Sequence, residues 1–334
     1  MSTRLQGLFD EIAPPEANGS EKPIYAVVPV PEYESYFVGK DRNECACLLV
    51  AAGEHSERMH SPIRLENLDV QFQLRCHLRR RDEAERMGTF TVVRCRSLDA
   101  ELTRYFLLVC DTIIGRVGDQ PKQGELAAAI LRLAAIFQKM QKPASRPLNG
   151  LFGELFFIWS SANPPKAVAA WRVDDAARFD FAEGNVRIDV KATSGRLRSH
   201  TFSYEQCNPP PGTIAVVISL FVERSPGGIS LRSLVNEVET RIAAFPDMVL
   251  KLHETVAATL GSSLSEAMSA AFDTHLAESS MKLYSLLDVP AIRGPLPPGV
   301  SEMHFRSDLS SMCALSIEAL VRQDPTFRDL LPQL

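Results

Sequence analysis

The chain has 334 residues, 45% of them hydrophobic and 23% charged, with a formal net charge of −5 at pH 7 and a pI of about 5.9. This composition predicts a globular protein of about two domains and excludes a disordered or fibrous chain. The acidic balance argues against a generally basic nucleic-acid coat, although it leaves room for a local basic groove.

No stretch of the sequence indicates export or a membrane span. The first residues lack the apolar core of a signal peptide, and there is no apolar run of about 18 residues. Seven cysteines, an odd number scattered along the chain, are typical of buried thiols in a reducing compartment. We therefore expect a cytoplasmic protein without membrane contact.

Residues 1–97 predict a strand-rich, antiparallel N-terminal module. Short β-type runs are separated by Pro, Gly, Asn and charged residues. These runs span residues 24–30, 36–39, 46–52, 70–78 and 89–95. No residue in the module indicates a reaction, so we expect it to grip substrate or a partner, or to serve as a structural platform.

Residues 98–334 are expected to form one larger domain with a catalytic core at 148–224. A continuous β-branched run at 214–222 predicts a central strand that is covered on both faces. Apolar periodicity and the positions of Pro and Gly predict the elements around the core. Helices are expected at 98–115, 121–140, 230–244, 249–260, 264–276 and 315–321, and strands at 281–289 and 302–306.

A helix at the start of the core carries the first candidate functional residue. Its apolar residues recur at helical spacing from Leu148 to Trp159 and form a buried arc. Glu154 falls at the margin of this arc, not on the opposite face. A carboxylate held near the edge of a core needs a partner.

Two strands after this helix carry further carboxylates and an amine. Apolar and polar residues alternate over residues 186–193, so Asp189 and Lys191 point to the same face. A two-residue loop at Gly184 and Asn185 would place Asp180 directly opposite Asp189, whereas a four-residue loop would place it diagonally on the same face. Two facing carboxylates repel unless a cation lies between them.

These residue types predict a metal site that cuts phosphodiesters. Carboxylate oxygens suit Mg²⁺ or Mn²⁺, which complete their shells with water and substrate phosphate. In this interpretation Glu154, Asp180 and Asp189 bind the metal, and Lys191 holds the nucleophile or stabilises the developing charge. The alternative is a surface strand on which Asp189 and Lys191 form a solvated ion pair, worth about 0–1 kcal/mol.

The same residues resemble the PD-(D/E)XK nuclease superfamily. The resemblance is carried by Gly150-Leu-Phe-Gly-Glu154, Phe179-Asp180-Phe181 and Asp189-Val-Lys191. More narrowly, they are similar to an uncharacterised bacterial family of PD-(D/E)XK proteins often encoded among restriction and phage-defence genes. The Ser-x-x-Gln segment of that family is matched by Ser203-Tyr-Glu-Gln206. The resemblance covers about residues 150–206 and implies a restriction-endonuclease-like α/β (α+β) fold, a mixed sheet flanked by helices.

The resemblance also implies roles for individual residues. Glu154, Asp180 and Asp189 would be metal ligands, Lys191 the catalytic lysine and Gln206 an accessory site residue. The sequence departs from the family pattern in three places: no proline precedes Asp180, Asp189 replaces the commoner Glu, and Cys207 stands where the family usually has Leu. Gln206 is equally well described as an ordinary polar residue near a helix start.

Two basic clusters are candidates for contact with nucleic-acid phosphates. Arg196, Arg198 and His200 follow Lys191 closely enough to flank the site, and a second cluster lies at residues 75–81. Arginine is well suited to bidentate phosphate contacts. Either cluster could equally be a solvated edge.

Together these features predict a Mg²⁺-dependent endonuclease, with Mn²⁺ as a substitute, that acts on DNA in bacterial restriction or anti-phage defence. The alternatives are a DNA-repair nuclease and a catalytically inactive, nuclease-like DNA-binding or assembly subunit. A homodimer is a further hypothesis, because cutting both strands with one site per chain commonly needs two copies. The sequence contains no glycine-rich phosphate loop, so an ATP-driven mechanism would need an ATPase partner, and a methyltransferase is another expected partner.

Overall fold

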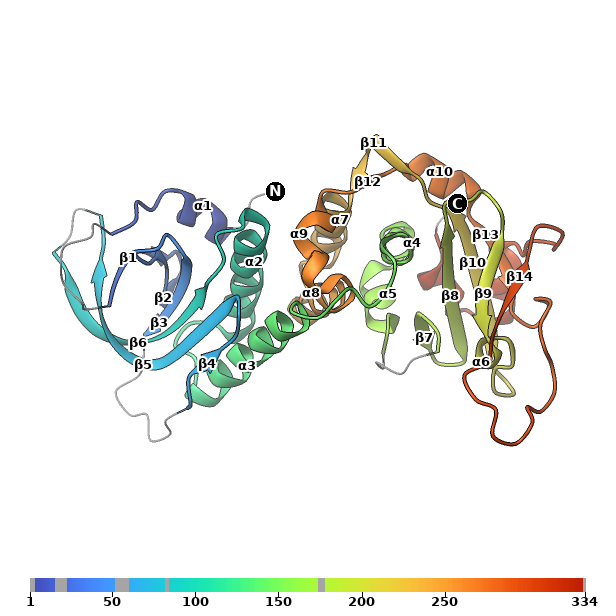
Figure 1. The fold of residues 1–334 in the computed structure, drawn as a ribbon, viewed down its shortest axis with the longest axis horizontal. Helices are drawn as coiled ribbons and strands as arrows, with labels where there is room; N and C mark the ends of the chain where they lie inside the picture. The colour runs from blue at the N-terminus through green and yellow to red at the C-terminus, as the bar shows by residue number, and fades with distance from the viewer. Residues whose placement is uncertain (1–3, 16–22, 52–59, 82–83, 174–177, 333–334) are drawn as a thin grey trace. The chain divides into compact units, whose positions relative to one another are not determined.

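A computed structural model describes residues 4–15, 23–51, 60–81, 84–173 and 178–332. The chain divides into two compact units. Unit 1 comprises Met1–Ser145 and Leu260–Ser265, and unit 2 comprises Arg146–Thr259 and Glu266–Leu334. Figure 1 shows the elements of both units with their labels.

Unit 1 is built on a six-stranded sheet in the order β1-β2-β3-β6-β5-β4 (Figure 1). Its strands are β1 (Ile24–Val30), β2 (Tyr33–Lys40), β3 (Ala46–Ala51), β4 (Ile63–Arg64), β5 (Leu68–Arg79) and β6 (Arg86–Cys95). β1 also pairs with β5, so five strands close into a ring. The β1–β5 pair is parallel, whereas the other pairs described in this sheet are antiparallel. Strand directions cannot alternate around a ring of five, which is why the expected antiparallel module contains a parallel pair.

Three helices complete the main elements of unit 1: α1 (Arg4–Asp10), α2 (Ala100–Val117) and α3 (Gln123–Lys139). α2 begins after Asp99, whose carboxylate accepts hydrogen bonds from two backbone N–H groups of the first turn. The helix contacts α1, α3, β3 and β6. The compact units therefore divide near residue 145, whereas the sequence pattern predicts a boundary at residue 97. The difference arises because α2 and α3 bury their apolar faces within unit 1.

Unit 2 contains a four-stranded sheet in the order β13-β10-β8-β7. Its strands are β7 (Phe181–Glu183), β8 (Val186–Thr193), β10 (Ile214–Phe221) and β13 (Lys282–Ser285). β8 and β10 are parallel and the other two pairs antiparallel, which is the predicted mixed sheet. Glu183 pairs with Val186, so Gly184 and Asn185 form the loop. This register confirms the two-residue hairpin, and Gly184 takes the left-handed φ of 48° that glycine adopts readily.

The remaining elements are mostly helices and two short strand pairs. The helices are α4 (Leu148–Ser160), α5 (Pro164–Ala170), α6 (Tyr204–Cys207), α7 (Leu231–Ile242), α8 (Pro246–Leu260), a 3₁₀ turn (Gly261–Ser263), α9 (Leu264–Met268), α10 (Thr274–Ser280), α11 (Ile317–Gln323) and α12 (Phe327–Leu330). β9 (Ser199–Ser203) pairs with β14 (His304–Asp308), and β11 (Arg224–Ser230) pairs with β12 (Ala271–Phe272). The prediction of a single helix at 264–276 is wrong. β12 interrupts this range, and Asp273 caps α10 as a separate helix.

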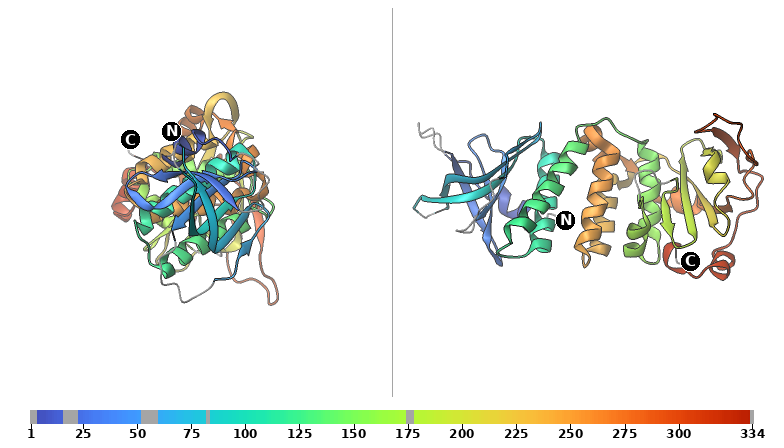
Figure 2. Two further views of the ribbon diagram at one scale, coloured as in Figure 1. Left: turned by 90° about the vertical axis from the view of Figure 1, so that its left-hand side faces the viewer. Right: turned by 90° about the horizontal axis from the view of Figure 1, so that it is seen from below.

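The two faces of β8 meet different elements. α4 lies on one side of β8 and β9 on the other (Figures 1 and 2). Side chains alternate along a strand, so Val190 and Ala192 face α4 while Asp189 and Lys191 face the side of β9. On that second side an apolar cluster joins β9, α6 and β10. Its members include Phe202, Cys207, Ala215 and Val217.

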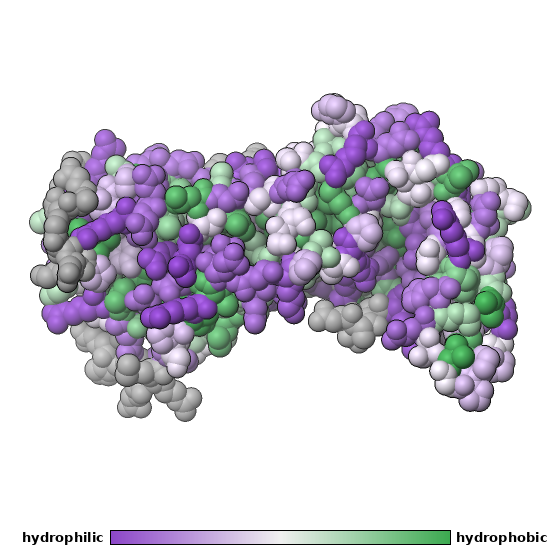
Figure 3. All heavy atoms as spheres, in the orientation of Figure 1, coloured by the Kyte–Doolittle hydropathy of each residue, from purple (hydrophilic) through white to green (hydrophobic). Residues whose placement is uncertain are grey.

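Polar and apolar residues are interspersed on the surface seen in Figure 3. In the ranges that the structure describes, no helix has the length and apolar character needed to cross a membrane. The seven cysteines are unpaired, and Cys313 is exposed while the other six are buried. The expectation of buried thiols is therefore confirmed for six of them.

Candidate active site

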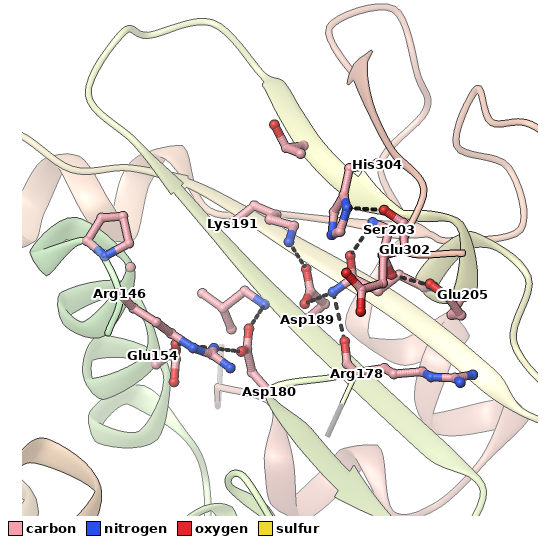
Figure 4. Close-up of a pocket in the computed structure, with 15 residues that line it drawn as sticks. Arg146, Glu154, Arg178, Asp180, Asp189, Lys191, Ser203, Glu205, Glu302 and His304 are labelled. Carbon is pink, nitrogen blue, oxygen red and sulfur yellow. Dashed lines mark hydrogen bonds and ion pairs between the residues drawn. The ribbon is translucent and has the colours of Figure 1, made fainter. Parts of the chain in front are cut away.

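A pocket of about 590 Å³ in unit 2 collects the residues that the sequence motifs indicate (Figure 4). Glu154 comes from α4, Asp180 from the residue before β7, Asp189 and Lys191 from β8, and Gln206 from α6. The fold thus brings together side chains that lie far apart along the chain. Asp180, Asp189 and Lys191 point toward the same space, as the hairpin register predicts.

Glycine at position 153 allows Glu154 to reach this pocket. A Cβ built on Gly153 would lie 2.8 Å from Cβ of Ala192 and 3.4 Å from Cγ1 of Val190. Contacts of 2.8 Å are too short for two carbon atoms, so a larger side chain would push α4 away from β8. The glycine before Glu154 therefore sets the depth at which the helix carries its carboxylate.

Asp189 is 2% exposed, and its two oxygens have different partners. Oδ1 accepts a hydrogen bond from Nε2 of Gln206 at 2.7 Å, and Oδ2 lies 2.8 Å from Nζ of Lys191. Burial raises the pKa of Asp189, and the charge of Lys191 opposes this effect. Burial acts to lower the pKa of Lys191, but the carboxylates of Asp189 and Asp180 outweigh it and hold that pKa above its ordinary value. The lysine is therefore charged at neutral pH.

Gln206 is oriented by a capping box at the start of α6. Its backbone N–H donates to Oγ of Ser203, and its Oε1 accepts from the backbone N–H of Ser203 at 3.0 Å. The amide group therefore presents its NH₂ to Asp189 and to the carbonyl of Arg178, which accepts at 2.8 Å. The Ser-x-x-Gln spacing thus has a physical role, because the cap fixes the side chain that holds Asp189.

Asp180 occupies the point where the β7–β8 ladder ends. Its Oδ2 accepts from the backbone N–H of Val190 at 2.9 Å, and its Oδ1 accepts from Nη1 of Arg146 at 2.9 Å. The residue is 6% exposed. A short carboxylate at this place therefore continues the strand pairing and faces the pocket at the same time.

Glu154 is held by two neighbouring residues of the segment after α5. Arg172 donates from Nη2 to Oε1 at 2.8 Å and from Nε to Oε2 at 2.9 Å, and Trp171 donates from Nε1 to Oε2 at 2.5 Å. Burial, and next the charge of Asp180, raise the pKa of Glu154, while Arg172 opposes both. This carboxylate is therefore the partner of a half-buried guanidinium, an interaction that the sequence pattern did not indicate.

Each of the three carboxylates predicted to bind metal is thus paired with a basic side chain. Arg172 pairs with Glu154, Lys191 with Asp189, and Arg146 with Asp180. Within residues 4–332, apart from the undescribed gaps, no three His, Cys, Asp or Glu side chains are arranged to hold a metal ion. The predicted set of three carboxylate ligands is therefore not assembled in this structure, because each carboxylate is neutralised by a basic side chain instead.

The donor chemistry nevertheless fits a divalent cation at two of these residues. Apart from its ion pair with Lys191, the buried Oδ2 of Asp189 has no hydrogen-bond partner in the described part of the chain, and each oxygen of Asp180 accepts one hydrogen bond. A carboxylate oxygen can accept about two. Oε2 of Glu154 already accepts two, so Glu154 does not fit as a direct ligand through that atom. Asp180 and Asp189 are the residues that could hold Mg²⁺ or Mn²⁺.

The candidate phosphate contacts after Lys191 lie outside this pocket. Arg196 pairs with Glu223 at 2.6 Å, and Arg198, only 7% exposed, donates to the carbonyl and hydroxyl oxygens of Ser219. His200 is 5% exposed and contacts the same hydroxyl. Arg198 directly precedes β9, His200 lies within it, and both side chains are buried against Ser219 of β10. The structure therefore corrects the prediction for these two residues, since buried side chains cannot contact phosphate.

The sequence motifs missed several other residues of the pocket. These are Arg146, Arg178, Glu302 and His304, whereas Ser203 and Glu205 lie in the Ser-x-x-Gln motif without a predicted role. Glu302 and His304 reach the site through the pairing of β14 with β9, a long-range contact that no local pattern indicates. Arg146 had a usable signal, because it lies two residues before the helix that carries Glu154.

The buried position of His200 predicts a pH effect on stability. Burial, and then the charges of Lys191 and Arg198, lower the pKa of His200 to about 4, below its ordinary value of 6.5. The unfolded chain binds this proton first, so the stabilisation from neutral His200 is lost as the pH falls from about 6.5 to 4. We expect the free energy of unfolding of His200→Gln, measured with urea at pH 7 and pH 5, to fall less than that of the wild type.

The matched control is His275→Gln, which alters an exposed histidine and should keep the wild-type pH dependence. Glu154 and Asp189 have raised pKa values and act in the opposite sense, but they are present in all three proteins. An unchanged pH dependence in His200→Gln would contradict a buried neutral histidine.

Comparisons with known proteins bear on the same residues. A family model described as "Putative PD-(D/E)XK family member, (DUF4420)" matches residues 8–310, which is most of the chain. The match includes all five residues predicted to form the site. Neither the curated proteins nor the solved structures contain a match.

Proposed function

This chain belongs to the PD-(D/E)XK family whose model matches it, and from this membership we propose that it is a metal-dependent nuclease that hydrolyses DNA phosphodiester bonds. The mixed α/β fold is consistent with a PD-(D/E)XK nuclease-like fold. The observation that carries the proposal is the meeting of Asp180, Asp189 and Lys191 in one pocket. Two carboxylates and a charged amine are suited to phosphodiester hydrolysis.

Each residue has a role in the proposed reaction. Asp180 and Asp189 would hold Mg²⁺ or Mn²⁺, which when bound supplies a water of lowered pKa and neutralises charge on the phosphate. Lys191 donates hydrogen bonds to the attacking water or to a phosphate oxygen and stabilises the negative charge that develops. Gln206 keeps Oδ1 of Asp189 occupied and so fixes the orientation of that carboxylate.

The exposed Arg178 at the pocket supports a phosphate-bearing substrate. The proposal includes an endonucleolytic cut and a role in bacterial restriction or anti-phage defence. In that role the chain would act together with a partner ATPase or a partner methyltransferase. A homodimer would supply the second site needed for the opposite strand.

A second candidate function is a nuclease-like DNA-binding or assembly subunit that does not cut. One observation favours it: Glu154, Asp180 and Asp189 are each neutralised by a basic side chain, and no three-residue metal group is found in the described residues. A pocket with balanced charges gains less from binding a cation than one with excess carboxylates.

A cleavage assay separates the two functions. The purified chain is expected to convert supercoiled plasmid into nicked and linear forms with Mg²⁺ or Mn²⁺, but not with EDTA. Single-stranded DNA and RNA of equal length, tested in parallel, decide the substrate class. DNA binding without cleavage under either metal would favour the non-cutting subunit, and cleavage of RNA alone would contradict a DNA substrate.

A further inference from the structure

Arg146 is the basic residue of the pocket that touches two of its carboxylates. Its Nη1 lies 2.9 Å from Oδ1 of Asp180 and 3.5 Å from Oε1 of Glu154. Figure 4 shows the guanidinium beside both acids. The Arg146 side chain is 41% exposed, whereas those of Glu154 and Asp180 are 3% and 8% exposed. A partly solvated cation thus pairs with the buried Asp180 and also lies near the buried Glu154.

Arg172 and Lys191, the cations that pair with Glu154 and Asp189, are held more firmly. Arg172 binds both oxygens of Glu154 and also donates to Oγ1 of Thr259, and its side chain is 14% exposed. Lys191 is 21% exposed and lies over the ring of Phe202. Arg146 has one hydrogen bond in the part of the chain that the structure describes, to Asp180. It is therefore the cation that costs least to displace.

The position of Arg146 along the chain also permits movement. It precedes α4 in an irregular segment, and neither a helix nor a strand fixes its backbone. Its neighbours Pro147 and Gly150 line the same pocket. The side chain can therefore leave Asp180 and remain at the rim of the pocket.

We propose that Arg146 occupies the cation position beside Asp180 in the metal-free protein and transfers to a DNA phosphate when a divalent ion binds. This inference rests on the proposed nuclease function and adds a residue that couples metal binding to substrate binding. A divalent ion at Asp180 repels the guanidinium and removes its carboxylate partner. A phosphate then provides two oxygens for the bidentate contact that arginine favours.

The coupling has two consequences with opposite signs. Without DNA, Arg146 competes with the metal for Asp180 and weakens metal binding. With DNA, the displaced guanidinium binds phosphate, so each ligand strengthens binding of the other, because linkage between two binding sites is reciprocal. Removing the charge of Arg146 should therefore tighten metal binding while it weakens DNA binding.

Arg146→Gln tests both consequences without relying on cleavage. Mn²⁺ binding is measured by electron paramagnetic resonance without DNA, and binding of a fluorescent DNA duplex is measured by anisotropy with Ca²⁺ in place of Mg²⁺. We expect Mn²⁺ affinity to rise roughly 5- to 20-fold and DNA affinity to fall by a similar factor, within the usual range of coupling between sites. Arg146→Lys keeps the charge, so it should bind Mn²⁺ as the wild type does but bind DNA more weakly.

Arg187→Gln is the matched control, because its guanidinium donates to backbone carbonyls of the β7–β8 turn and lies outside the pocket lining. The affinities of this variant for Mn²⁺ and for DNA should both match those of the wild type.

Equal Mn²⁺ affinity in the wild type and Arg146→Gln would overturn the inference. It would leave the nuclease proposal intact if plasmid is cut. Tighter Mn²⁺ binding together with weaker DNA binding by Arg146→Gln, in a protein that cuts nothing, would support the inference and reject the nuclease. Absence of Mn²⁺ binding in both would overturn the inference, and the plasmid assay would then judge the nuclease separately.

Discussion

Lys191→Met is expected to lower the turnover number for DNA cleavage by about 10²- to 10³-fold, the usual cost of removing one group that stabilises charge in the transition state. The amine lies 2.8 Å from Asp189 and lines the pocket, whereas Lys166 pairs with Asp329 at the surface with 57% of its side chain exposed. Lys166→Met is therefore the matched control and should cleave as the wild type does. Plasmid cleavage at saturating Mg²⁺ measures the difference.

Asp189→Asn separates the role of the carboxylate from that of the amine. We expect it to lose both cleavage and Mn²⁺ binding, whereas Lys191→Met should lose cleavage and still bind Mn²⁺. Asp308→Asn, which alters an exposed aspartate at the end of β14, is the control. Wild-type cleavage by Asp189→Asn or Lys191→Met would reject this pocket as the active site.

Glu154→Ala is expected to lower the free energy of unfolding by about 3–5 kcal/mol, the range for removing one partner of a buried ion pair. Glu154 is 2% exposed and accepts three hydrogen bonds from Arg172 and Trp171. Its loss leaves the indole N–H of Trp171 and the Nε and Nη2 groups of Arg172 without these acceptors, while Nη1 of Arg172 keeps Oγ1 of Thr259. Glu183→Ala removes an exposed acid from β7 and should change the free energy of unfolding by less than about 0.5 kcal/mol. Urea denaturation monitored by tryptophan fluorescence provides the measurement.

A double-mutant cycle tests the cause of this loss. Glu154→Leu combined with Arg172→Leu removes both charges, so the double variant should be less destabilised than the sum of the two single variants. If the losses in free energy of unfolding of the two single variants add up to that of the double variant, the ion pair is not the main source of the destabilisation. If Glu154→Ala unfolds as the wild type does but binds Mn²⁺ weakly, Glu154 is a metal ligand and not a structural anchor.

Local patterns were sufficient to predict the parts of the site that lie on neighbouring segments. The alternation over residues 186–193 and the turn at Gly184 predict that Asp180, Asp189 and Lys191 share a face, and the strand register agrees. Short loops leave few registers open, and a shift of one residue would turn the apolar side chains of β8 outward. The same holds for Ser203 and Gln206, which cap a single helical turn.

Partners that arrive from distant segments could not be predicted in this way. Arg172 neutralises Glu154, Arg198 is buried where it donates to Ser219 and Ser280, and β9 is paired by β14, about a hundred residues later. Whether a polar face of a strand meets water or another strand depends on that pairing. The boundary near residue 145 has a similar origin, since the apolar stripes of α2 and α3 do not indicate which elements they pack against.

The sequence by itself therefore determined the mixed α/β fold, the hairpin, and the carboxylates and lysine that share a pocket, because these follow from periodicity and turn chemistry over short separations. Only the tertiary structure decided the charge state of that pocket. Arg146, Arg172 and Lys191 each neutralise one acid there. Electrostatic pairing depends on distances of a few ångströms in space, and the order of residues along a chain does not specify such distances between remote segments.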